Sequence, residues 1–396
     1  MIPITRPWLP PLEAYAALLE GVWSSRMLSN FGVLATRLEA HARDYLGAAH
    51  VLSVSSGDVA LALALRAFEL PAGGRVLVPS FTFNSTVNAI LWNGLRPDFI
   101  DIDPATLTVD PGDVAARLDG AVAIVATHVF GSPADVESLA ALARQAGVRL
   151  LFDAAHGYGS LHGGRHIGTF GDAEVFSLSG TKPATSGEGG LFATADPDLA
   201  ERFRYLRAYG FQGDYNSHYV GLNGKLSELH AALGLLTLPR IEEALAARAR
   251  HVRAYRERLG AIPGVLLQRV QPTDRSTYKD FAVIFSAAED RARVEAALAA
   301  EEIQTKRYFR PCHRMDAYRV HADRPLPITE WVAERILCLP LFEDLTDEDR
   351  DLVCGVAEAA IAKGDESLRG RAPVAVRRSR HRTRVATAGG HGDPAA

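Results

Sequence analysis

Short apolar runs alternate with helix-like stretches between about residues 50 and 195. Continuous apolar runs such as 121–126 are typical of strands that are covered on both faces. Strands separated by helices predict an α/β fold with a large, doubly wound, mostly parallel sheet. The predicted strands include 76–78, 97–101, 121–126, 149–152, 173–178 and 191–194, with helices at 58–66, 84–92 and 136–145.

The chain changes character after a long helical segment that spans residues 227–259. Pro239 should interrupt this helix near residue 238, because proline cannot donate the helical hydrogen bond. We therefore expect a large domain over 1–240 and a smaller C-terminal α+β domain over 241–364. The elements predicted for the smaller domain are strands at 281–285 and 335–339, a helix at 291–301, and a helix at 346–363 with Thr346 as its N-cap.

Charge is unevenly distributed along the chain. The formal net charge is −4, which argues against nucleic acid or an anionic membrane as the main partner. Residues 369–396 hold seven arginines and one acid, lack apolar periodicity, and predict a disordered basic tail over 365–396. Three scattered cysteines predict no disulfide framework. Together with an N-terminus unlike a signal peptide and no apolar run of about 20 residues, they predict a cytoplasmic protein.

One lysine and one aspartate follow neighbouring predicted strands. Asp153 closes the run at 148–152, and Lys182 follows the run at 173–178 within a glycine-rich loop. Parallel strands that end at the same edge would direct both side chains into one crevice. Pyridoxal phosphate (PLP) requires such a pair, a lysine for a Schiff base and a carboxylate beside its ring nitrogen. Taken separately, Lys182 would be a surface lysine in most chains and Asp153 a helix cap.

A phosphate site is predicted where the Ser55-Ser-Gly57 turn leads into a helix. Free N–H groups at a helix start, together with the helix dipole, bind anions. Ser177 could add a hydroxyl to the same phosphate. Each feature alone has an ordinary explanation: serine and glycine before a helix usually form only a cap, and Ser177 could simply end its strand.

Aromatic and histidine side chains could complete such a site. Phe81 or Phe83 could cover a planar cofactor, although core packing is the usual role of two aromatics at a strand end. His156 could hydrogen-bond a cofactor or substrate, or be purely structural. We find no spacing of metal ligands such as His-Glu-x-x-His and no dinucleotide-binding glycine loop.

Taken in order, these segments resemble the nucleotide-sugar aminotransferases of the DegT/DnrJ/StrS type, a branch of the PLP-dependent fold-type I enzymes. The resemblance covers about residues 5–362. The segments that carry it are 55–57, 79–83, 128–135, 153–156, 176–190, 221–229 and 339–342.

The resemblance implies a role for each matching residue. Lys182 corresponds to the Schiff-base lysine, Asp153 to the carboxylate on the ring nitrogen and Phe83 to the stacking aromatic. The phosphate would be held by Gly57, Asp58, Val59 and Ser177, and by Asn223 of a neighbouring subunit, so a homodimer is implied. Tyr308 and His313 fall where substrate contacts are expected. Asp58 and Ser179 depart from the threonine and histidine that are frequent at their positions.

The resemblance also implies a reaction, in which Lys182 transfers protons while nitrogen passes from L-glutamate, through pyridoxamine phosphate, to a keto sugar on a nucleotide. His156 favours amination at C4 of the sugar, because relatives with glutamine there favour C3. Segments 278–281 and 308–311 resemble those of 4-aminotransferases that act on dTDP-4-keto-6-deoxyglucose. The alternatives are a 3-aminotransferase, a sugar dehydratase, and a non-catalytic regulator of the same fold.

Overall fold

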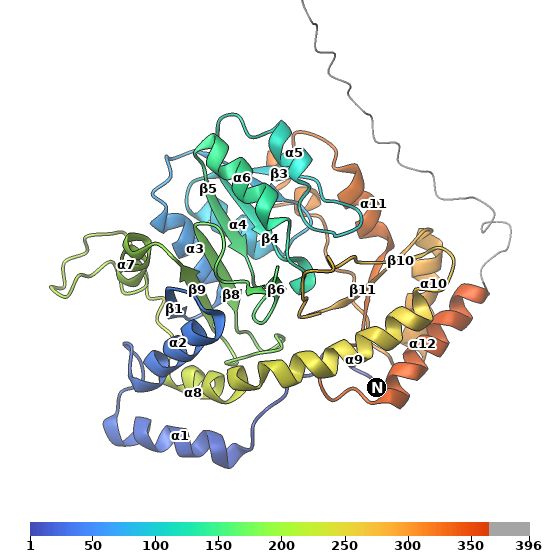
Figure 1. The fold of residues 1–396 in the computed structure, drawn as a ribbon, viewed down its shortest axis with the longest axis horizontal. Helices are drawn as coiled ribbons and strands as arrows, with labels where there is room; N and C mark the ends of the chain where they lie inside the picture. Colours follow the sequence, from blue (N-terminus) through green and yellow to red (C-terminus); the bar gives the residue numbers. More distant parts are fainter. Residues whose placement is uncertain (364–396) are drawn as a thin grey trace, which may run out of the picture. The chain divides into compact units, whose positions relative to one another are not determined.

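The computed structural model describes residues 1–363, and its centre is a seven-stranded sheet (Figure 1). The strand order is β1-β9-β8-β5-β4-β2-β3, with all strands parallel except β9. The predicted mostly parallel, doubly wound sheet is therefore confirmed. Its strands are β1 (His50–Val54), β2 (Arg75–Pro79), β3 (Arg96–Ile100), β4 (Ala121–Thr127), β5 (Arg149–Asp153), β8 (Ala173–Ser177) and β9 (Gly190–Thr194).

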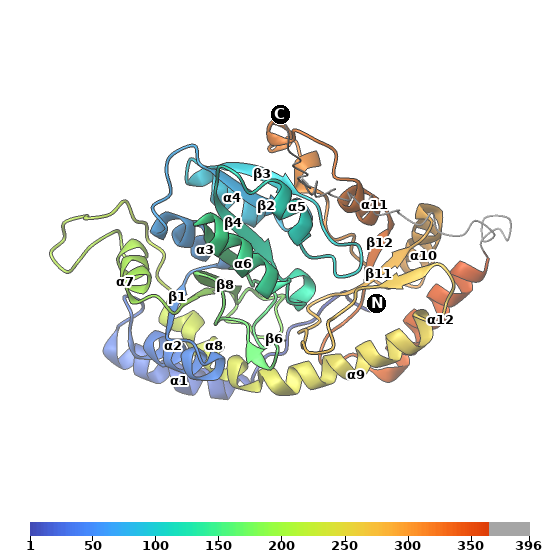
Figure 2. The ribbon, with the colours of Figure 1, turned by 45° about the horizontal axis from the view of Figure 1, so that its top comes forward.

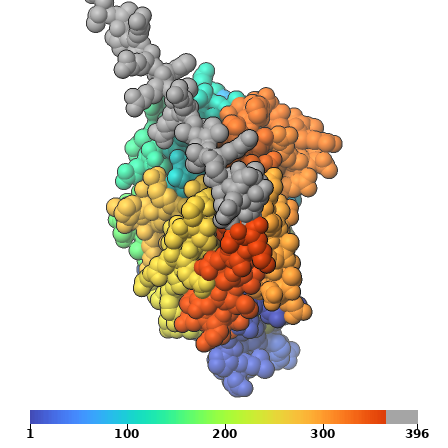
Figure 3. Space-filling view, turned by 90° about the vertical axis from the view of Figure 1, so that its right-hand side faces the viewer, coloured from blue at the N-terminus to red at the C-terminus, as the bar shows by residue number. Residues whose placement is uncertain are grey.

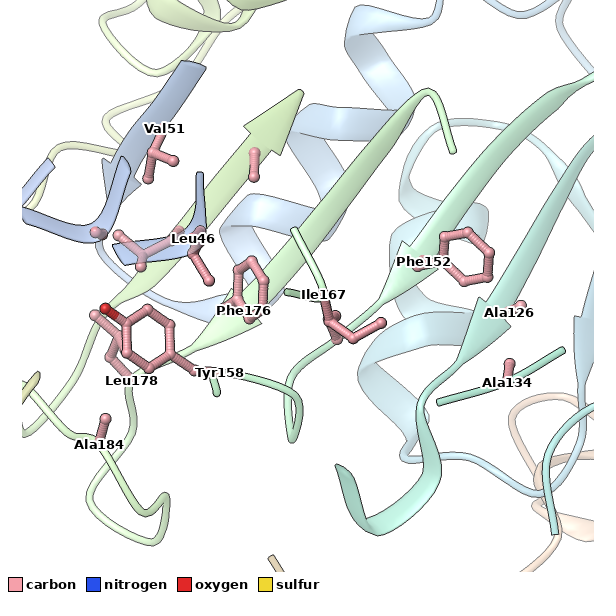
Figure 4. Packing of buried hydrophobic residues seen from close by; sticks show 14 of the residues in the cluster. Leu46, Val51, Ala126, Ala134, Phe152, Tyr158, Ile167, Phe176, Leu178 and Ala184 are labelled. Carbon is pink, nitrogen blue, oxygen red and sulfur yellow. The ribbon is translucent and has the colours of Figure 1, made fainter. Parts of the chain in front are cut away.

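Helices cover both faces of this sheet. Alternate side chains of each strand point to opposite faces, and those on both faces are apolar and buried. Phe152 and Phe176 belong to the core on one face, as Figure 4 shows, whereas Leu151 and Val175 belong to the core on the other. The first face carries α1 (Leu12–Ser25), α2 (Val33–Leu46), α5 (Pro111–Ala116), α6 (Val136–Ala146) and α8 (Glu228–Thr237); the second carries α3 (Gly57–Ala67), α4 (Asn84–Trp92) and α7 (Pro197–Leu206).

A second, three-stranded sheet with the order β10-β11-β12 lies toward the C-terminal part of the chain (Figure 2). The hydrophobic core on this sheet includes Ile2, which forms a parallel β-bridge with Ile303. Figure 3 shows α9 (yellow) beside α12 (red) on this part of the surface. The elements are α9 (Ile241–Leu259), β10 (Val265–Leu267), β11 (Phe281–Phe285), α10 (Ala288–Ala300), α11 (Pro327–Arg335), β12 (Ile336–Leu339) and α12 (Asp347–Ala362).

The predicted interruption at Pro239 is confirmed, since a 3₁₀ turn at Leu238–Arg240 separates α8 from α9. Thr346 caps α12 by accepting a hydrogen bond from the Asp349 N–H, as predicted. The domain boundary at 240 stays a prediction. The predicted basic tail over 365–396 lies outside the described residues. No helix within residues 1–363 is long and apolar enough to cross a membrane.

Candidate active site

The predicted lysine and aspartate do lie at the carboxyl ends of two neighbouring strands, β5 and β8. Asp153 is the last residue of β5 and pairs with Val175 of β8. Ser177 ends β8 opposite Gly190, and Lys182 lies in the loop between these two residues. The loop is closed by backbone hydrogen bonds, including one from Leu178 N–H to the Gly189 carbonyl at 2.8 Å. Lys182 is thereby held at the edge where Asp153 emerges.

Lys182 lies in a mixed electrostatic environment. The pKa of Lys182 is lowered to about 7, chiefly by burial and also by nearby Lys279 and Lys306, while Asp280 and Asp153 act in the opposite direction. An amine with a pKa of about 7 is about half unprotonated at neutral pH, and the unprotonated form is the nucleophile and the base. The site therefore supplies the chemistry that a Schiff-base lysine requires.

Asp153 is buried, and its carboxylate is held by two donors. Thr86 donates from its hydroxyl to Oδ2 at 2.6 Å, and the Ala155 N–H donates to Oδ1 at 3.1 Å. Burial raises the pKa of Asp153, whereas these two hydrogen bonds and Lys182 lower it. A carboxylate has about four acceptor positions, so Asp153 keeps capacity for one further donor, such as a protonated ring nitrogen.

Two more threonines, neither of them a predicted site residue, extend this network. Thr82 lies 2.9 Å from the Thr86 hydroxyl, and Thr127 lies 3.0 Å from the Thr82 hydroxyl. Because the single hydroxyl proton of Thr86 is donated to Asp153, the Thr82 hydroxyl must donate to Thr86 and the Thr127 hydroxyl must donate to Thr82. The only signal in the sequence was the presence of threonines at strand ends and at a helix start, which is too common to be specific.

The residues predicted to hold a phosphate lie where α3 begins against the end of β8. A Cβ on Gly57 would lie 3.0 Å from the Ser177 Cβ, so only glycine fits there without displacing Ser177. Ser56 caps the helix by accepting from the Val59 N–H at 3.2 Å. Among the described residues, the N–H groups of Gly57 and Asp58 make no hydrogen bond. These two groups can bind an anion directly, while Val59 would share its donor with Ser56.

His156 lies beside this edge, with its ring nearly parallel to the rings of Phe130 and Phe309 at centroid distances of 6.4 Å to each, while the two phenylalanine rings stack on one another at 5.5 Å. Its Nδ1 atom is buried and makes no hydrogen bond within the described chain. Burial lowers the pKa of His156 well below its usual value, and Lys182, Lys279 and Lys306 act in the same direction. The ring is therefore neutral, with one nitrogen available to a bound molecule.

The two candidate aromatics have different environments. Phe81 is fully buried and packs against Phe130 and Phe309, so it belongs to the core. Phe83 is 52% exposed at the start of α4. Only Phe83 is free to cover a planar group, and its stacking role stays a prediction.

Two of the three residues assigned to partner or substrate contacts, Asn223 and Tyr308, are at least partly accessible to solvent. Asn223 is exposed, and its Oδ1 accepts from Lys225 Nζ at 2.7 Å. Tyr308 is half-buried, and its hydroxyl accepts from Lys306 Nζ at 3.3 Å. Their predicted contacts with a neighbouring subunit's phosphate and with substrate stay predictions.

His313 is buried away from such contacts. Its Nδ1 lies 2.6 Å from the Ser80 hydroxyl and its Nε2 lies 3.0 Å from Glu330 Oε1. Both ring nitrogens are thus already used within the fold. A substrate could be bound by His313 only if one of these bonds were given up, so the structure favours a structural role.

Taken together, the residues at this edge fit PLP. Two free N–H groups and the Ser177 hydroxyl can hold a phosphate, Asp153 has an acceptor position for the ring nitrogen, and Lys182 supplies an amine whose pKa is lowered. The orphaned His156 Nδ1 lies beside this group of residues.

Comparisons with known proteins agree with this geometry. The model of the DegT/DnrJ/EryC1/StrS aminotransferase family matches residues 13–357. The dTDP-4-amino-4,6-dideoxy-D-glucose transaminase of Escherichia coli is 30% identical over 356 residues, which cover 88% of this chain and 95% of that protein. The UDP-N-acetyl-3-dehydro-alpha-D-glucosamine 3-aminotransferase of Acidithiobacillus ferrooxidans is 33% identical over 314 residues, covering 78% and 84%. A solved structure of DesI with its TDP-sugar product is 36% identical, with a TM-score of 0.85 and coverage of 91% and 93%.

Proposed function

We propose a specific reaction from the premise that this chain belongs to the DegT/DnrJ/EryC1/StrS aminotransferase family and is a PLP-dependent enzyme that aminates nucleotide sugars. The proposed reaction moves the amino group of L-glutamate to C4 of dTDP-4-keto-6-deoxyglucose. The observation that carries it is the convergence of Lys182, Asp153 and the start of α3 at one edge of the sheet.

Each residue of this group has one task in the proposed reaction. PLP, when bound, supplies an aldehyde that takes up an amino group and a ring that stabilises negative charge on the adjacent carbon. Lys182 removes the proton from Cα of glutamate and later returns a proton to the sugar carbon that receives nitrogen. Asp153 keeps the ring nitrogen protonated. Gly57, Asp58 and Ser177 fix the phosphate, and Phe83 covers the ring.

Amination at C4 is supported by His156, because family members with histidine at this position favour that carbon. It is also supported by the name of the Escherichia coli relative, which specifies a 4-amino sugar. The dTDP carrier is supported by that same relative and by the TDP-sugar in the DesI structure. A second candidate is amination at C3 of a 3-keto nucleotide sugar, which is favoured by a relative of similar identity named as a 3-aminotransferase.

A homodimer is part of the proposal. Asn223 would reach the phosphate bound by the partner subunit, and the segment that carries it exposes large apolar side chains, which is typical of an interface. These side chains are Tyr209, Tyr215, Val220 and Leu222. A cytoplasmic location is also proposed, and it is consistent with three free, buried cysteines.

The deciding experiment presents the purified protein with L-glutamate and a panel of 3-keto and 4-keto nucleotide sugars. Nuclear magnetic resonance of the product then locates the new amine. The proposal predicts amination of the dTDP-4-keto sugar at C4. Amination only of 3-keto substrates would overturn it in favour of the second candidate, and His156→Gln serves as a probe of the residue on which the choice depends.

A further inference from the structure

An arginine-rich cavity of about 370 Å³ lies at the edge of the large sheet opposite the candidate active site. Arg75 and Arg96 line this cavity and are the first residues of the parallel strands β2 and β3, whereas the candidate active site lies at the carboxyl ends of β5 and β8. Arg117, which follows α5, and residues 320–323 form the other walls. Cavities that bind small molecules have volumes of about 300–1,000 Å³, so this one is large enough for a small ligand.

One buried carboxylate fixes two of these arginines. Asp98 of β3 is only 4% exposed, and its Oδ1 accepts a hydrogen bond from Arg117 Nε at 2.9 Å. Arg75 Nη1 donates to Oδ2 of the same carboxylate and, at 3.0 Å, to the Arg117 carbonyl. Two guanidinium groups therefore share one carboxylate, which holds both in place but balances only one of their charges.

The remaining charges of the cavity do not restore the balance. Arg96 lies beside Arg75 in the register of β2 and β3, so two positive side chains leave the sheet on the same face. Within residues 1–363, the Arg96 side chain makes no hydrogen bond and no ion pair. Asp323 binds Arg117 Nη2 at 2.6 Å, but its side chain is 57% exposed. With Asp98, two carboxylates face three arginines, and an excess of positive charge remains.

The unused donors of the cavity match a phosphate group. Arg117 donates through Nε and Nη2, and its Nη1 makes no hydrogen bond in the described part of the chain. Arg96 retains all five of its N–H groups. Guanidinium forks bind the oxygens of phosphate in pairs, and a phosphate group offers more acceptor oxygens and more negative charge than a carboxylate does. Donors spread over two side chains therefore favour phosphate.

One wall of the cavity is apolar. Val320 lines it with a side chain that is 79% exposed, and Pro97 and Ala322 add further apolar surface. A site that combines charged donors with an apolar wall suits a ligand with an anionic group and an uncharged organic part. Sugar phosphates and nucleotides have this composition.

We propose that this cavity is a second binding site, which holds the phosphate group of a small phosphorylated molecule. Arg96 and Nη1 of Arg117 bind the phosphate oxygens, Asp98 keeps Arg117 in position, and Val320 contacts the organic part of the ligand. Because the site lies at the amino ends of β2 and β3, its ligand does not compete with the cofactor at the carboxyl ends of β5 and β8. The inference does not depend on which sugar the enzyme aminates.

The test measures Arg96 directly in the full-length protein saturated with PLP, so that phosphate does not enter the cofactor's site. Phenylglyoxal modifies accessible guanidinium groups, and mass spectrometry of the peptides gives the rate of modification at each arginine. The probes are inorganic phosphate and glucose 1-phosphate, with chloride at equal ionic strength as the reference. Arg253 of α9, also exposed and without a hydrogen bond or ion pair within residues 1–363, is the control in the same sample.

Both probes should protect Arg96 and leave Arg253 unprotected. At a tenfold excess of probe over its dissociation constant, modification of Arg96 should slow by about tenfold. Glucose 1-phosphate should protect at a lower concentration than inorganic phosphate if the organic part contacts Val320, and equal potency would identify free phosphate as the ligand. Absence of protection at millimolar concentrations, or equal protection of Arg96 and Arg253, would overturn the proposal.

Two variants of exposed side chains check the location by a second method. Arg96→Gln should weaken the binding of glucose 1-phosphate, followed by calorimetry of the PLP-saturated protein, by about tenfold or more. Arg253→Gln should bind as the original protein does. Unchanged binding by Arg96→Gln would place the ligand elsewhere, the substrate site included, and would reject the cavity as a phosphate site.

Discussion

The hydroxyl of Thr86 lies 2.6 Å from Oδ2 of Asp153, and both side chains are buried. Thr86 comes from the first turn of α4, whereas Asp153 ends β5, so the contact joins residues 67 positions apart. The Thr127 hydroxyl donates to the Thr82 hydroxyl, which in turn donates to the Thr86 hydroxyl. The network gives the carboxylate one defined orientation and favours its ionised form.

Replacing Thr86 with valine should weaken the binding of PLP. The variant keeps the shape of the side chain but removes a hydrogen bond to a charged group, which contributes about 1.5–3 kcal/mol. We expect the dissociation constant for PLP to rise by about tenfold or more. Titration of the cofactor-free protein, followed by absorbance, measures it. Thr86→Ser retains the hydroxyl and should bind nearly as tightly; equal binding by the valine variant would contradict the role of Thr86.

Replacing Lys182 with alanine should abolish the covalent attachment of PLP. The nearby Lys279 is paired with Asp280, and Lys306 donates to the Tyr308 hydroxyl, so neither should replace Lys182 and borohydride should leave the protein unlabelled. Loss of the proton-transferring group should also reduce activity by about 10²–10⁴-fold or more. Lys363→Ala, at the exposed end of α12, is the control and should behave as the original protein. A reducible yellow complex in Lys182→Ala would show that another lysine carries the cofactor.

Replacing Gly57 with alanine should impair the phosphate site without unfolding the protein. The new Cβ would lie 3.0 Å from that of Ser177, so the start of α3 and the end of β8 must separate by a few tenths of an ångström. We expect a loss of PLP affinity of about tenfold, with a small change in melting temperature, since hydrogen bonds to phosphate depend on such distances.

The matched control for this change is Gly355→Ala in α12, where the added Cβ meets no atom closer than 4.0 Å. That substitution should leave PLP affinity unchanged and raise stability slightly, because alanine favours helices over glycine. Equal effects of the two substitutions on PLP affinity would reject the specific role of Gly57.

Sequence patterns predicted the sheet and the central pair because these depend on local order. The apolar runs that end at Asp153 and Ser177 are continuous in the chain, and parallel strands bring their ends together. The interruption at Pro239 was equally local. His313 was different: its partners Ser80 and Glu330 lie in other elements, and only the fold reveals that its nitrogens are already bonded.

The supporting contacts of the site could not be predicted for the same reason. The Thr86 hydroxyl donates to Asp153, and the Lys279 N–H donates to the Phe130 carbonyl, although the partners are far apart in the chain. Threonines in helices and Lys-Asp dipeptides are common in surface segments, so neither indicates in the sequence that the residue supports a site. Their burial, which is what makes them informative, is a property of the tertiary structure alone.

Glu174 should make the stability of the protein depend on pH. It is fully buried in β8, and its two oxygens accept from the N–H groups of Gly168 and Phe170 at 2.6 and 2.7 Å. Burial raises the pKa of Glu174 to about 8, against the opposing effect of these bonds and of Arg165. The folded protein therefore favours the neutral carboxyl group more than the unfolded chain does.

The sign of the effect follows from linkage. Because the folded pKa lies above the ordinary value of 4.5, the contribution to stability is complete below about pH 4.5 and is lost as the pH rises through about 8. At about 1.4 kcal/mol for each unit of pKa, the upper bound of the loss is about 5 kcal/mol. Glu174→Gln cannot ionise, so its free energy of unfolding should fall less between pH 5 and 9, as measured by urea denaturation. Glu257→Gln, an exposed control in α9, should follow the original protein. Parallel pH profiles for the original protein and Glu174→Gln would mean that Glu174 is ionised in the folded state throughout this range.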